Sequence, residues 1–359
     1  MNLARNIVSS LGIDKRDNVT IYFYPHMLKL AEETAEECFK KGADVLLNLY
    51  TDRFYEAYLT HLSEESLKQP SDFCRALTET STVEILIGAA YDPSFLKDIQ
   101  PAKLAATNEG ENKAHYPPQR KRSIRSAVVH MGSVTKPRAE GFGLDYVKWR
   151  RMVEQASLVD AKILSRTGRR LASALNGGEK VVLTGPEGTR LECSLKNRVA
   201  VVDDGVIDQR DLRKGFADTE VPSGKVTIAP NETTAEGKVI FNLPILFRGQ
   251  MIRRLEWKFR HGRVMSFDGD SSATALREMW KKAAGDKERI ASLTVGINPK
   301  AELGFSLNSI AAGAVSVAIG ENQHLKGKNR STFRCQGTIG NASLMVDDRI
   351  LVEAGKIVQ

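Results

Sequence analysis

The N-terminal part of the chain alternates short apolar runs with amphipathic stretches. Residues 19–24 are β-branched and aromatic, which predicts a strand. Residues 28–41 carry apolar side chains at helical spacing and stop at Gly42, a typical helix end. Further strands are predicted at residues 43–50, 83–89 and 127–130, with a helical stretch at residues 53–62. Strands separated by helices favour βαβ units, so we expect an α/β domain with a mainly parallel sheet.

The pattern changes after a long helical stretch at residues 146–175, which ends at Asn176-Gly177-Gly178 and is expected to bridge two domains. A hairpin is predicted next, because residues 180–183 and 189–195 flank Gly185-Pro186-Glu187-Gly188. The remaining predicted elements are strands at residues 238–242, 251–259, 263–267, 314–318, 344–348 and 350–353 and helices at residues 273–284 and 286–293. We therefore expect an α/β domain over residues 1–145 and an α+β domain, with a mixed and largely antiparallel sheet, over residues 146–359.

Length and cysteine usage indicate a globular protein from a reducing compartment. A chain of 359 residues can form two domains that each bury a core. The four cysteines are far apart in sequence, which favours free thiols over a disulfide framework. Residues 1–14 lack the charged and then apolar pattern of a signal peptide, and no apolar run has the length of a membrane span. We expect a cytoplasmic protein without a membrane partner.

The formal net charge of +8 raises the question of a nucleic-acid partner. Basic side chains are dense over residues 113–125, but Tyr116 is the one aromatic residue among them. Pro117-Pro118 argues against a basic helix there. We predict a solvated loop that could steer an acidic ligand, and nucleic acid is not expected as a partner. No Gly-x-Gly-x-x-Gly or phosphate loop follows a predicted strand, so no nucleotide cofactor is expected either.

Five short segments carry a family resemblance. They are Val221-Pro222-Ser223-Gly224-Lys225-Val226, Glu236-Gly237-Lys238-Val239-Ile240-Phe241-Asn242, Gly296-Ile297-Asn298-Pro299, Val317-Ala318-Ile319-Gly320 and Asn341-Ala342-Ser343. In this order and at these spacings the chain resembles the aminopeptidase T and aminopeptidase S family, leucyl-aminopeptidase-like enzymes with a two-metal centre. The resemblance covers most of the chain and implies the same two-domain fold and a homodimer.

The residues that bind metal in that family are largely replaced. The family uses a Glu in a Pro-Ser-Gly-Glu-Val turn, a Glu that closes a helix, a His before Ile-Ala-x-Gly, a Tyr seven residues later, and a final His-x-Asp pair. The matching positions of this chain hold Lys225, Ser292, Ser316, Gln323, Val346 and Asp348, in that order. Only Asp348 is a metal ligand by type, and its neighbour Asp347 leaves that register open by one residue.

This set does not suit a two-metal centre. Each ion needs about three or four N, O or S ligands, and bridging carboxylates hold the two ions about 3.5–4 Å apart. One carboxylate cannot do this, and the ammonium of Lys225 would repel a metal ion. The resemblance therefore extends to the scaffold and not to metallo-aminopeptidase chemistry, and no metal or other cofactor is expected.

Other residues offer weaker candidates. His324 is the one histidine near the segment and would be a ligand only if the alignment had slipped. Cys335 is open to a nucleophilic role but is more simply a small apolar residue. The acidic pairs Asp203-Asp204, Asp268-Gly269-Asp270 and Asp347-Asp348 fall at predicted turns, where Asp and Gly are expected for backbone reasons.

The reading that results is a catalytically inactive aminopeptidase-like protein. It binds a peptide or amino-acid-like ligand in the former active-site cleft, where it could escort a peptide to modifying enzymes. Its ligand-binding residues would be Lys225, Ser292, Ser316, Gln323 and Asp348, with Lys225 paired to Asp348 in place of the metals, whereas catalytic residues stay unassigned. Two alternatives remain open: a metal-independent enzyme acting on a peptide or small amide, with Lys225 as base or imine former, and a metal-dependent aminopeptidase with displaced ligands.

Overall fold

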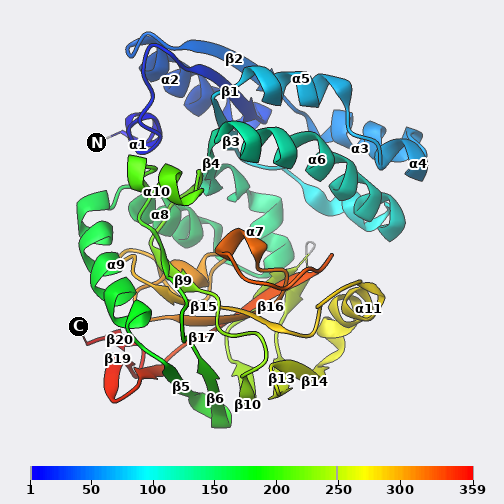
Figure 1. Ribbon diagram of the computed structural model, residues 1–359. Helices are drawn as coiled ribbons and strands as arrows, with labels where there is room; N and C mark the ends of the chain where they lie inside the picture. Colours follow the sequence, from blue (N-terminus) through cyan, green and yellow to red (C-terminus); the bar gives the residue numbers. More distant parts are fainter. Residues whose placement is uncertain (1, 248–249, 359) are drawn as a thin grey trace. The chain divides into compact units, whose positions relative to one another are not determined.

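The computed structural model describes residues 2–247 and 250–358, and the chain divides into two compact units (Figure 1). Unit 1 comprises Met1–Leu158 and Gly205–Pro222, and unit 2 comprises Val159–Asp204 and Ser223–Gln359. The division differs from the predicted boundary at residue 145. The difference has two causes. The helical segment directly after residue 145 belongs to unit 1, and Gly205–Pro222 returns to unit 1 and adds a strand to its sheet.

The sheet of unit 1 is parallel throughout, which confirms the α/β prediction. Its order is β2-β1-β3-β4-β8, formed by β1 (Asn18–Phe23), β2 (Asp44–Leu49), β3 (Val83–Ile87), β4 (Arg125–Val129) and β8 (Asp218–Val221). Helix α1 (Leu3–Ser10) precedes β1. Between the strands lie α2 (Leu28–Phe39), α3 (Asp52–His61), α4 (Glu64–Leu67), α5 (Asp72–Thr80), α6 (Pro101–Arg122), α7 (Lys136–Phe142), α8 (Tyr146–Ser157) and α10 (Gln209–Lys214). The N-cap side chains of Thr51, Ser63 and Ser71 start α3, α4 and α5 by accepting backbone N–H groups, as short polar residues do.

Helix α6 corrects the prediction of a loop over residues 113–125. The helix runs to Arg122 with Pro117 and Pro118 inside it. A proline in a helix interior costs about 3 kcal/mol through its missing N–H and its clash with the preceding turn. Packing against α4 and α5, which buries Ala106 and Ala114, stabilises the helix despite that cost. The proline pair lies near the C-terminal end, where it disturbs few turns.

Unit 2 is built from antiparallel sheets, as predicted. The larger has the order β14-β13-β10-β6-β5-β18-β19-β20 and consists of β5 (Lys180–Gly185), β6 (Thr189–Ser194), β10 (Glu236–Phe241), β13 (Leu255–Arg260), β14 (Arg263–Gly269), β18 (Ser343–Val346), β19 (Arg349–Glu353) and β20 (Lys356–Ile357). The second, sheet C, has the order β17-β16-β15-β9-β7 and consists of β7 (Val201–Asp203), β9 (Lys225–Ile228), β15 (Ile290–Gly296), β16 (Val315–Gly320) and β17 (Arg334–Ile339). A small ribbon pairs β11 (Ile245–Phe247) with β12 (Gln250–Ile252).

Two helix predictions in this region need correction. Residues 286–293 do not form a helix, because β15 starts at Ile290 and is buried along its whole length between β9 and β16. The stretch at residues 146–175 is two helices, α8 and α9 (Ala161–Asn176), since the Asp160 side chain accepts the Lys162 N–H and starts a new helix. The predicted C-terminal helix is present as α11 (Thr274–Lys282).

The core of unit 2 lies between its two sheets. Trp257 of β13 contacts Phe241 of β10 with ring centroids 4.6 Å apart, and both are buried. The inward side chains of sheet C, such as Leu293 and Val317, belong to the same apolar cluster. The larger sheet therefore covers one face of sheet C, and the side chains of its other face point away from this core. None of the described helices combines the length and apolar character that crossing a membrane requires.

Candidate functional site

The second face of sheet C is polar, and it carries the candidate site. Side chains alternate between the two faces of a strand, so Leu293 and Val295 of β15 enter the core while Ser292 and Thr294 point to the opposite side. The same alternation and the strand register place nine polar residues on this surface. We call it the polar face, and it consists of Asp203, Lys225, Thr227, Ser292, Thr294, Ser316, Arg334, Gln336 and Thr338.

A row of four hydroxyl groups crosses the middle of the polar face. Thr227 pairs with Thr294 in register, Thr294 with Ser316, and Ser316 with Thr338. All four are buried. The Thr227 and Thr294 hydroxyl oxygens are 3.0 Å apart, and those of Ser316 and Thr338 are 2.9 Å apart. Because buried polar groups are costly without partners, this mutual pairing lets a polar layer persist inside the protein.

At one end of the polar face, Lys225 lies beside Asp203 on the neighbouring strand. The two residues are in register, and Lys225 Nζ is 3.7 Å from Asp203 Oδ2, with 23% and 16% of the side chains exposed. The predicted pairing of Lys225 with Asp348 is therefore wrong. Asp348 is exposed in the turn that joins β18 to β19, in the other sheet. A lysine next to a carboxylate keeps its ammonium charge favoured.

At the other end, Arg334 reaches across the sheet to Ser292. Its Nη2 donates to Ser292 Oγ at 2.9 Å, and its Nη1 donates to the Glu321 carbonyl oxygen at 2.6 Å. Burial lowers the pKa of the Arg334 guanidinium, and the Glu321 carboxylate opposes part of that shift. A guanidinium stays charged under all ordinary conditions, so this end of the polar face also presents a cation.

The Cα atoms of the two cationic residues are far apart on the polar face. Lys225 pairs with Gly296, four residues along β15 from Ser292. At about 3.3 Å per residue and about 4.8 Å between strands, the Cα atoms of Lys225 and Ser292 are about 14 Å apart. The same spacings put Lys225 and Arg334 about 24 Å apart, three strands and six positions away from each other. The polar face is thus elongated, with a cation at each end and neutral hydroxyls between.

The structure brings three of the five predicted site residues onto one surface and leaves two outside it. Lys225, Ser292 and Ser316 share the polar face. Gln323 is exposed in a short 3-10 turn after β16, and its backbone N–H donates to Glu321 Oε1 at 2.5 Å. Asp348 lies at the hairpin turn described above.

Arg334 and Gln336 were missed by the sequence reasoning. They are two residues apart on β17, so both side chains lie on the polar face. This is the spacing of the His-x-Asp pair that the resemblance assigned to Val346 and Asp348. Val346 instead is buried in the core cluster of unit 2. Arg334 and Gln336 are therefore the residues at this spacing that the polar face contains. Their signal was the alternation of β17, which a motif count from Asn341 could not use.

The other chemical candidates have structural explanations. His324 Nδ1 is 2.9 Å from Glu321 Oε2 in an exposed loop. Cys335 is buried on the core side of β17, and burial raises its pKa to about 12, so the thiolate needed for attack is not formed at neutral pH. Asp347 accepts the backbone N–H groups of Glu179 and Lys180, which is a structural role at a turn.

The donor set does not fit a metal centre. Within residues 2–247 and 250–358, no three His, Cys, Asp or Glu side chains come close enough to share an ion. On the polar face itself, Asp203 is the one carboxylate, and the Lys225 ammonium lies beside it. Hydroxyl groups of Ser292 and Ser316 are poor substitutes for the carboxylate and imidazole ligands that hold divalent ions in hydrolases.

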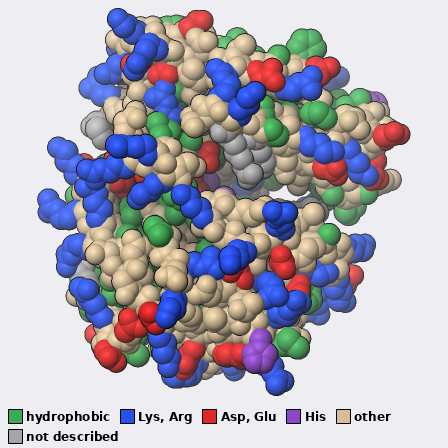
Figure 2. Space-filling view, viewed as in Figure 1, with side chains coloured by type: hydrophobic (Ala, Val, Ile, Leu, Met, Phe, Trp, Pro, Cys, Tyr) green, Lys and Arg blue, Asp and Glu red, His purple; other side chains and the backbone are tan. Residues whose placement is uncertain are grey.

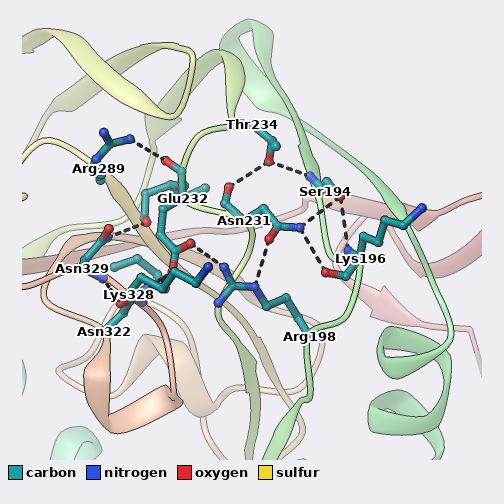
Figure 3. A network of polar contacts seen from close by, with 12 residues as sticks. Ser194, Lys196, Arg198, Asn231, Glu232, Thr234, Arg289, Asn322, Lys328 and Asn329 are labelled. Carbon is teal, nitrogen blue, oxygen red and sulfur yellow. Dashed lines mark hydrogen bonds and ion pairs between the residues drawn. The ribbon is translucent and has the colours of Figure 1, made fainter.

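A buried polar network fixes the loops at the Arg334 end (Figure 3). Arg198 and Glu232 form an ion pair with 12% and 8% of their side chains exposed. Glu232 Oε1 also accepts the Lys328 N–H at 2.7 Å and the Asn322 side-chain amide at 3.3 Å. Asn322 adjoins Glu321, whose carbonyl oxygen holds Arg334, so the network positions the loop that frames this cation.

Charged side chains do not gather in one patch on the face of the molecule seen in Figure 2. Lys and Arg side chains are distributed over both units there and alternate with Asp and Glu. A nucleic-acid partner would need a clustered basic stripe, and this view offers no support for one.

Comparisons with known proteins agree with the fold. The model of the thermophilic metalloprotease family M29 matches residues 2–288. Wild-type AmpT from Thermus thermophilus has a similar structure, with 16% sequence identity and a TM-score of 0.76 over 99% of this chain and 98% of that one. The structure of 2,5-dihydroxypyridine dioxygenase from Pseudomonas putida KT2440 is also similar, with 15% identity and a TM-score of 0.66 over 99% and 96% of the two chains. No curated protein matches. The aminopeptidase-like fold expected from the sequence is confirmed.

Proposed function

Because the chain belongs to the M29 family of thermophilic metalloproteases, we propose that it keeps the family scaffold without the metallopeptidase reaction and binds a peptide or amino-acid-like ligand on the polar face. One observation carries the proposal. A cation at Lys225 and hydroxyls at Ser292 and Ser316 stand where the resemblance places carboxylate and imidazole ligands. A surface of this composition attracts carboxylates and amide dipoles and repels metal ions.

The chemistry of the two ends suggests which ligand groups they receive. The neighbouring Lys225 ammonium and Asp203 carboxylate complement the charged ends of an amino acid, one binding its carboxylate and the other its ammonium group. The hydroxyls of the central row are buried and already pair with one another, so the charged ends carry the proposed recognition. An elongated ligand with a second anionic group would meet Arg334 at the far end. A short acidic peptide therefore matches the face better than a free apolar amino acid.

A metal-independent enzyme is the second candidate, and the geometry favours it less. An imine-forming or basic lysine must shed its proton, and the nearby Asp203 carboxylate favours the charged ammonium instead. Ser316 has no adjacent histidine to activate it, since its hydroxyl pairs with that of Thr338. The described polar face thus offers Lys225 as a binding group more readily than as a nucleophile.

The expected oligomeric state rests on the family resemblance, and the expected cellular location is supported by the free cysteine thiols. We expect a homodimer, as in the aminopeptidases that the chain resembles, and a cytoplasmic protein. All four cysteines are free, which agrees with a reducing compartment.

Calorimetric titration of the purified chain tests the proposal. The probes are a set of acidic tripeptides and the same peptides with an amidated C-terminus. We expect binding to the free acids, and Lys225→Met should weaken it about tenfold, which is about 1.4 kcal/mol. Lys258→Met, a change of the same kind at an exposed position of β13 in the other sheet, should leave it unchanged. Equal affinity for the amidated peptides, or about one divalent ion per chain together with arylamide hydrolysis, would overturn the proposal.

A further inference from the structure

Tyrosines follow the carboxyl ends of three neighbouring strands in unit 1. In the order β2-β1-β3-β4-β8, the chain leaves β1 to one side, forms β2, and then crosses to the other side to form β3. In open parallel sheets, ligands bind beyond the carboxyl ends of the strands at such a reversal. Tyr24 directly follows β1, Tyr50 directly follows β2, and Tyr91 follows β3 after Gly88-Ala89-Ala90. The edge at which a sheet of this topology binds ligands is therefore aromatic.

Two of these tyrosines and two from helix α3 form what we call the tyrosine cluster, which consists of Tyr24, Tyr50, Tyr55 and Tyr58. The ring centroids of Tyr24 and Tyr50 are 6.3 Å apart. Tyr55 and Tyr58 are three residues apart on α3, so they share one face of that helix. All four are partly buried, and Phe54, whose ring centroid is 6.0 Å from that of Tyr50, is 58% exposed. The cluster thus presents ring surface to solvent, where a ligand can contact it.

Glu111 of helix α6 lies beside the tyrosine cluster. It precedes His115 by one helical turn, so both side chains lie on the same face of α6, and this helix contacts α3 (Figure 1). The His115 ring meets Tyr22 edge-on with centroids 6.4 Å apart, and its Nδ1 is 2.8 Å from the Thr78 hydroxyl oxygen, which fixes this face toward the sheet. Burial raises the pKa of all four tyrosines of the cluster, and Glu111 adds to the increase in each one, which locates its carboxylate near them.

The Glu111 side chain has no partner among residues 2–247 and 250–358, with which it forms neither a hydrogen bond nor an ion pair. By contrast, Glu109 on the same helix pairs with Lys113 at 2.7 Å. Glu111 has an exposed surface, yet the groups around it displace enough water that burial raises the pKa of its carboxyl. A carboxylate that is accessible, poorly hydrated and unpaired gains stability when a ligand supplies a cation.

We propose that the tyrosine cluster and Glu111 bind an organic cation, an alkylammonium or guanidinium group that belongs to a free base or to a lysine or arginine side chain of a peptide. The negative faces of the tyrosine rings attract such groups, and Glu111 supplies the opposite formal charge. The phenols stay neutral beside it, since burial together with nearby carboxylates raises the pKa of Tyr24 to about 12. The inference does not depend on the ligand proposed for the polar face.

Arg138 is a second charged group near the cluster. Its Nε donates to the Ala90 carbonyl oxygen at 3.1 Å, and the Asp52 and Asp92 carboxylates lie near enough to oppose the lowering of its pKa by burial. At Tyr24, where burial contributes most to the raised pKa, Asp52 and Glu111 each have a larger effect than Arg138. The charges around the cluster therefore favour a cationic ligand over an anionic one.

Calorimetric titration with n-butylguanidine, and with n-butylurea as its neutral counterpart of the same shape, tests the site. We expect butylguanidine to bind at least about tenfold more tightly than butylurea. Glu111→Gln, which keeps the shape and removes the charge, should weaken butylguanidine binding at least about tenfold. Glu109→Gln on the same helix should leave it unchanged, because Glu109 already pairs with Lys113. Equal affinity for the two probes, or unchanged binding in Glu111→Gln, overturns the proposal.

Two substitutions of Tyr24 separate the ring from its hydroxyl group. Tyr24→Phe keeps the ring and should bind nearly as well as the wild type, whereas Tyr24→Leu should bind about threefold more weakly or worse, with thermal unfolding confirming that both variants fold. Acetyl-Gly-Arg-Gly-amide identifies the source of the cation. Binding of this peptide alone assigns the cation to a peptide side chain and binding of butylguanidine alone to a free base, and either supports the site if Glu111→Gln weakens it. Binding of neither probe, or equal binding by the two Tyr24 variants, refutes the site.

Discussion

Removing Arg198 should destabilise unit 2 more than removing any surface arginine. Arg198 pairs with Glu232, and both side chains are almost fully buried. Replacing Arg198 by Met leaves the Glu232 carboxylate without its cation in a low-dielectric setting. Breaking a buried pair in this way costs about 3–5 kcal/mol. The Lys328 N–H and the Asn322 amide still donate to Glu232, so we expect a loss of about 3 kcal/mol, at the lower end.

A double-mutant cycle separates the pair from the rest of the network. Glu232→Gln keeps an acceptor for Lys328 and should cost less than Arg198→Met. With both changes in place the stranded charge is gone, so a coupling energy of about 2 kcal/mol should be recovered. Urea denaturation followed by circular dichroism gives the free energies of unfolding. Arg150→Met is the matched control, because its pair with Glu154 is half exposed and is worth less than about 1 kcal/mol.

The pH dependence of the same proteins gives a second readout. Burial alone would raise the pKa of Glu232, but hydrogen bonds from the backbone N–H groups of Lys328 and of Glu232 itself, with Arg198, outweigh it and lower the pKa below 4.5. A carboxyl whose folded pKa is lowered stabilises the fold above its unfolded pKa, and the contribution is lost as the pH falls through the folded value. The difference in stability between wild type and Glu232→Gln should therefore shrink below pH 4.5. Strictly additive mutations, or a difference that is constant with pH, would refute the reasoning.

Two further predictions concern backbone and hydroxyl contacts. Gly262 has φ +76° in the turn between β13 and β14, and a Cβ there would lie 1.9 Å from the Glu232 carbonyl oxygen. Gly262→Ala should therefore lower the free energy of unfolding by at least about 2 kcal/mol. Gly215→Ala, with φ +79° and open space around it, should lower it by only about 1 kcal/mol in the same urea assay. Ser316→Val or Thr338→Val alone should cost about 1–3 kcal/mol by leaving a buried hydroxyl unpaired, whereas the double variant should be nearly neutral by thermal unfolding. Equal losses for both glycines, or a double variant as unstable as the sum of the singles, would contradict these two accounts.

The hydrophobic pattern of the sequence predicted the secondary structure well where burial and periodicity agreed. The parallel strands of unit 1 combine apolar side chains with helix signals on either side, and β1 and β3 lie where the sequence predicted them. Prediction failed where tertiary contacts decide. Helix α6 contains Pro117 and Pro118 because its packing with α4 and α5 outweighs the cost of placing prolines in a helix. The charged start of the segment at residues 286–293 has helical spacing, yet its second half is an interior strand.

The candidate site could be predicted only in part, for a related reason. Lys225, Ser292 and Ser316 are each next to a conspicuous motif, so their positions could be counted along the chain. Asp203, Arg334 and Gln336 reach the same face through strand pairing between distant segments, which no motif records. Asp348 was chosen for its residue type and its distance from Asn341. Its hairpin belongs to the other sheet, and sequence distance could not reveal that.

The composition of the polar face has a physical logic in a protein that works without metal ions, as proposed above. Carboxylates brought together to hold two divalent ions would repel one another without them, and burial would add several kcal/mol for each uncompensated charge. Replacing a single ligand would leave the others stranded, so such positions must change together. Here the central positions carry hydroxyls that satisfy one another in pairs, and the outer positions carry cations with partners at Asp203 and Ser292. These pairs let the face stay polar in the metal-free protein that we propose, and the proposed ligand site needs such a surface.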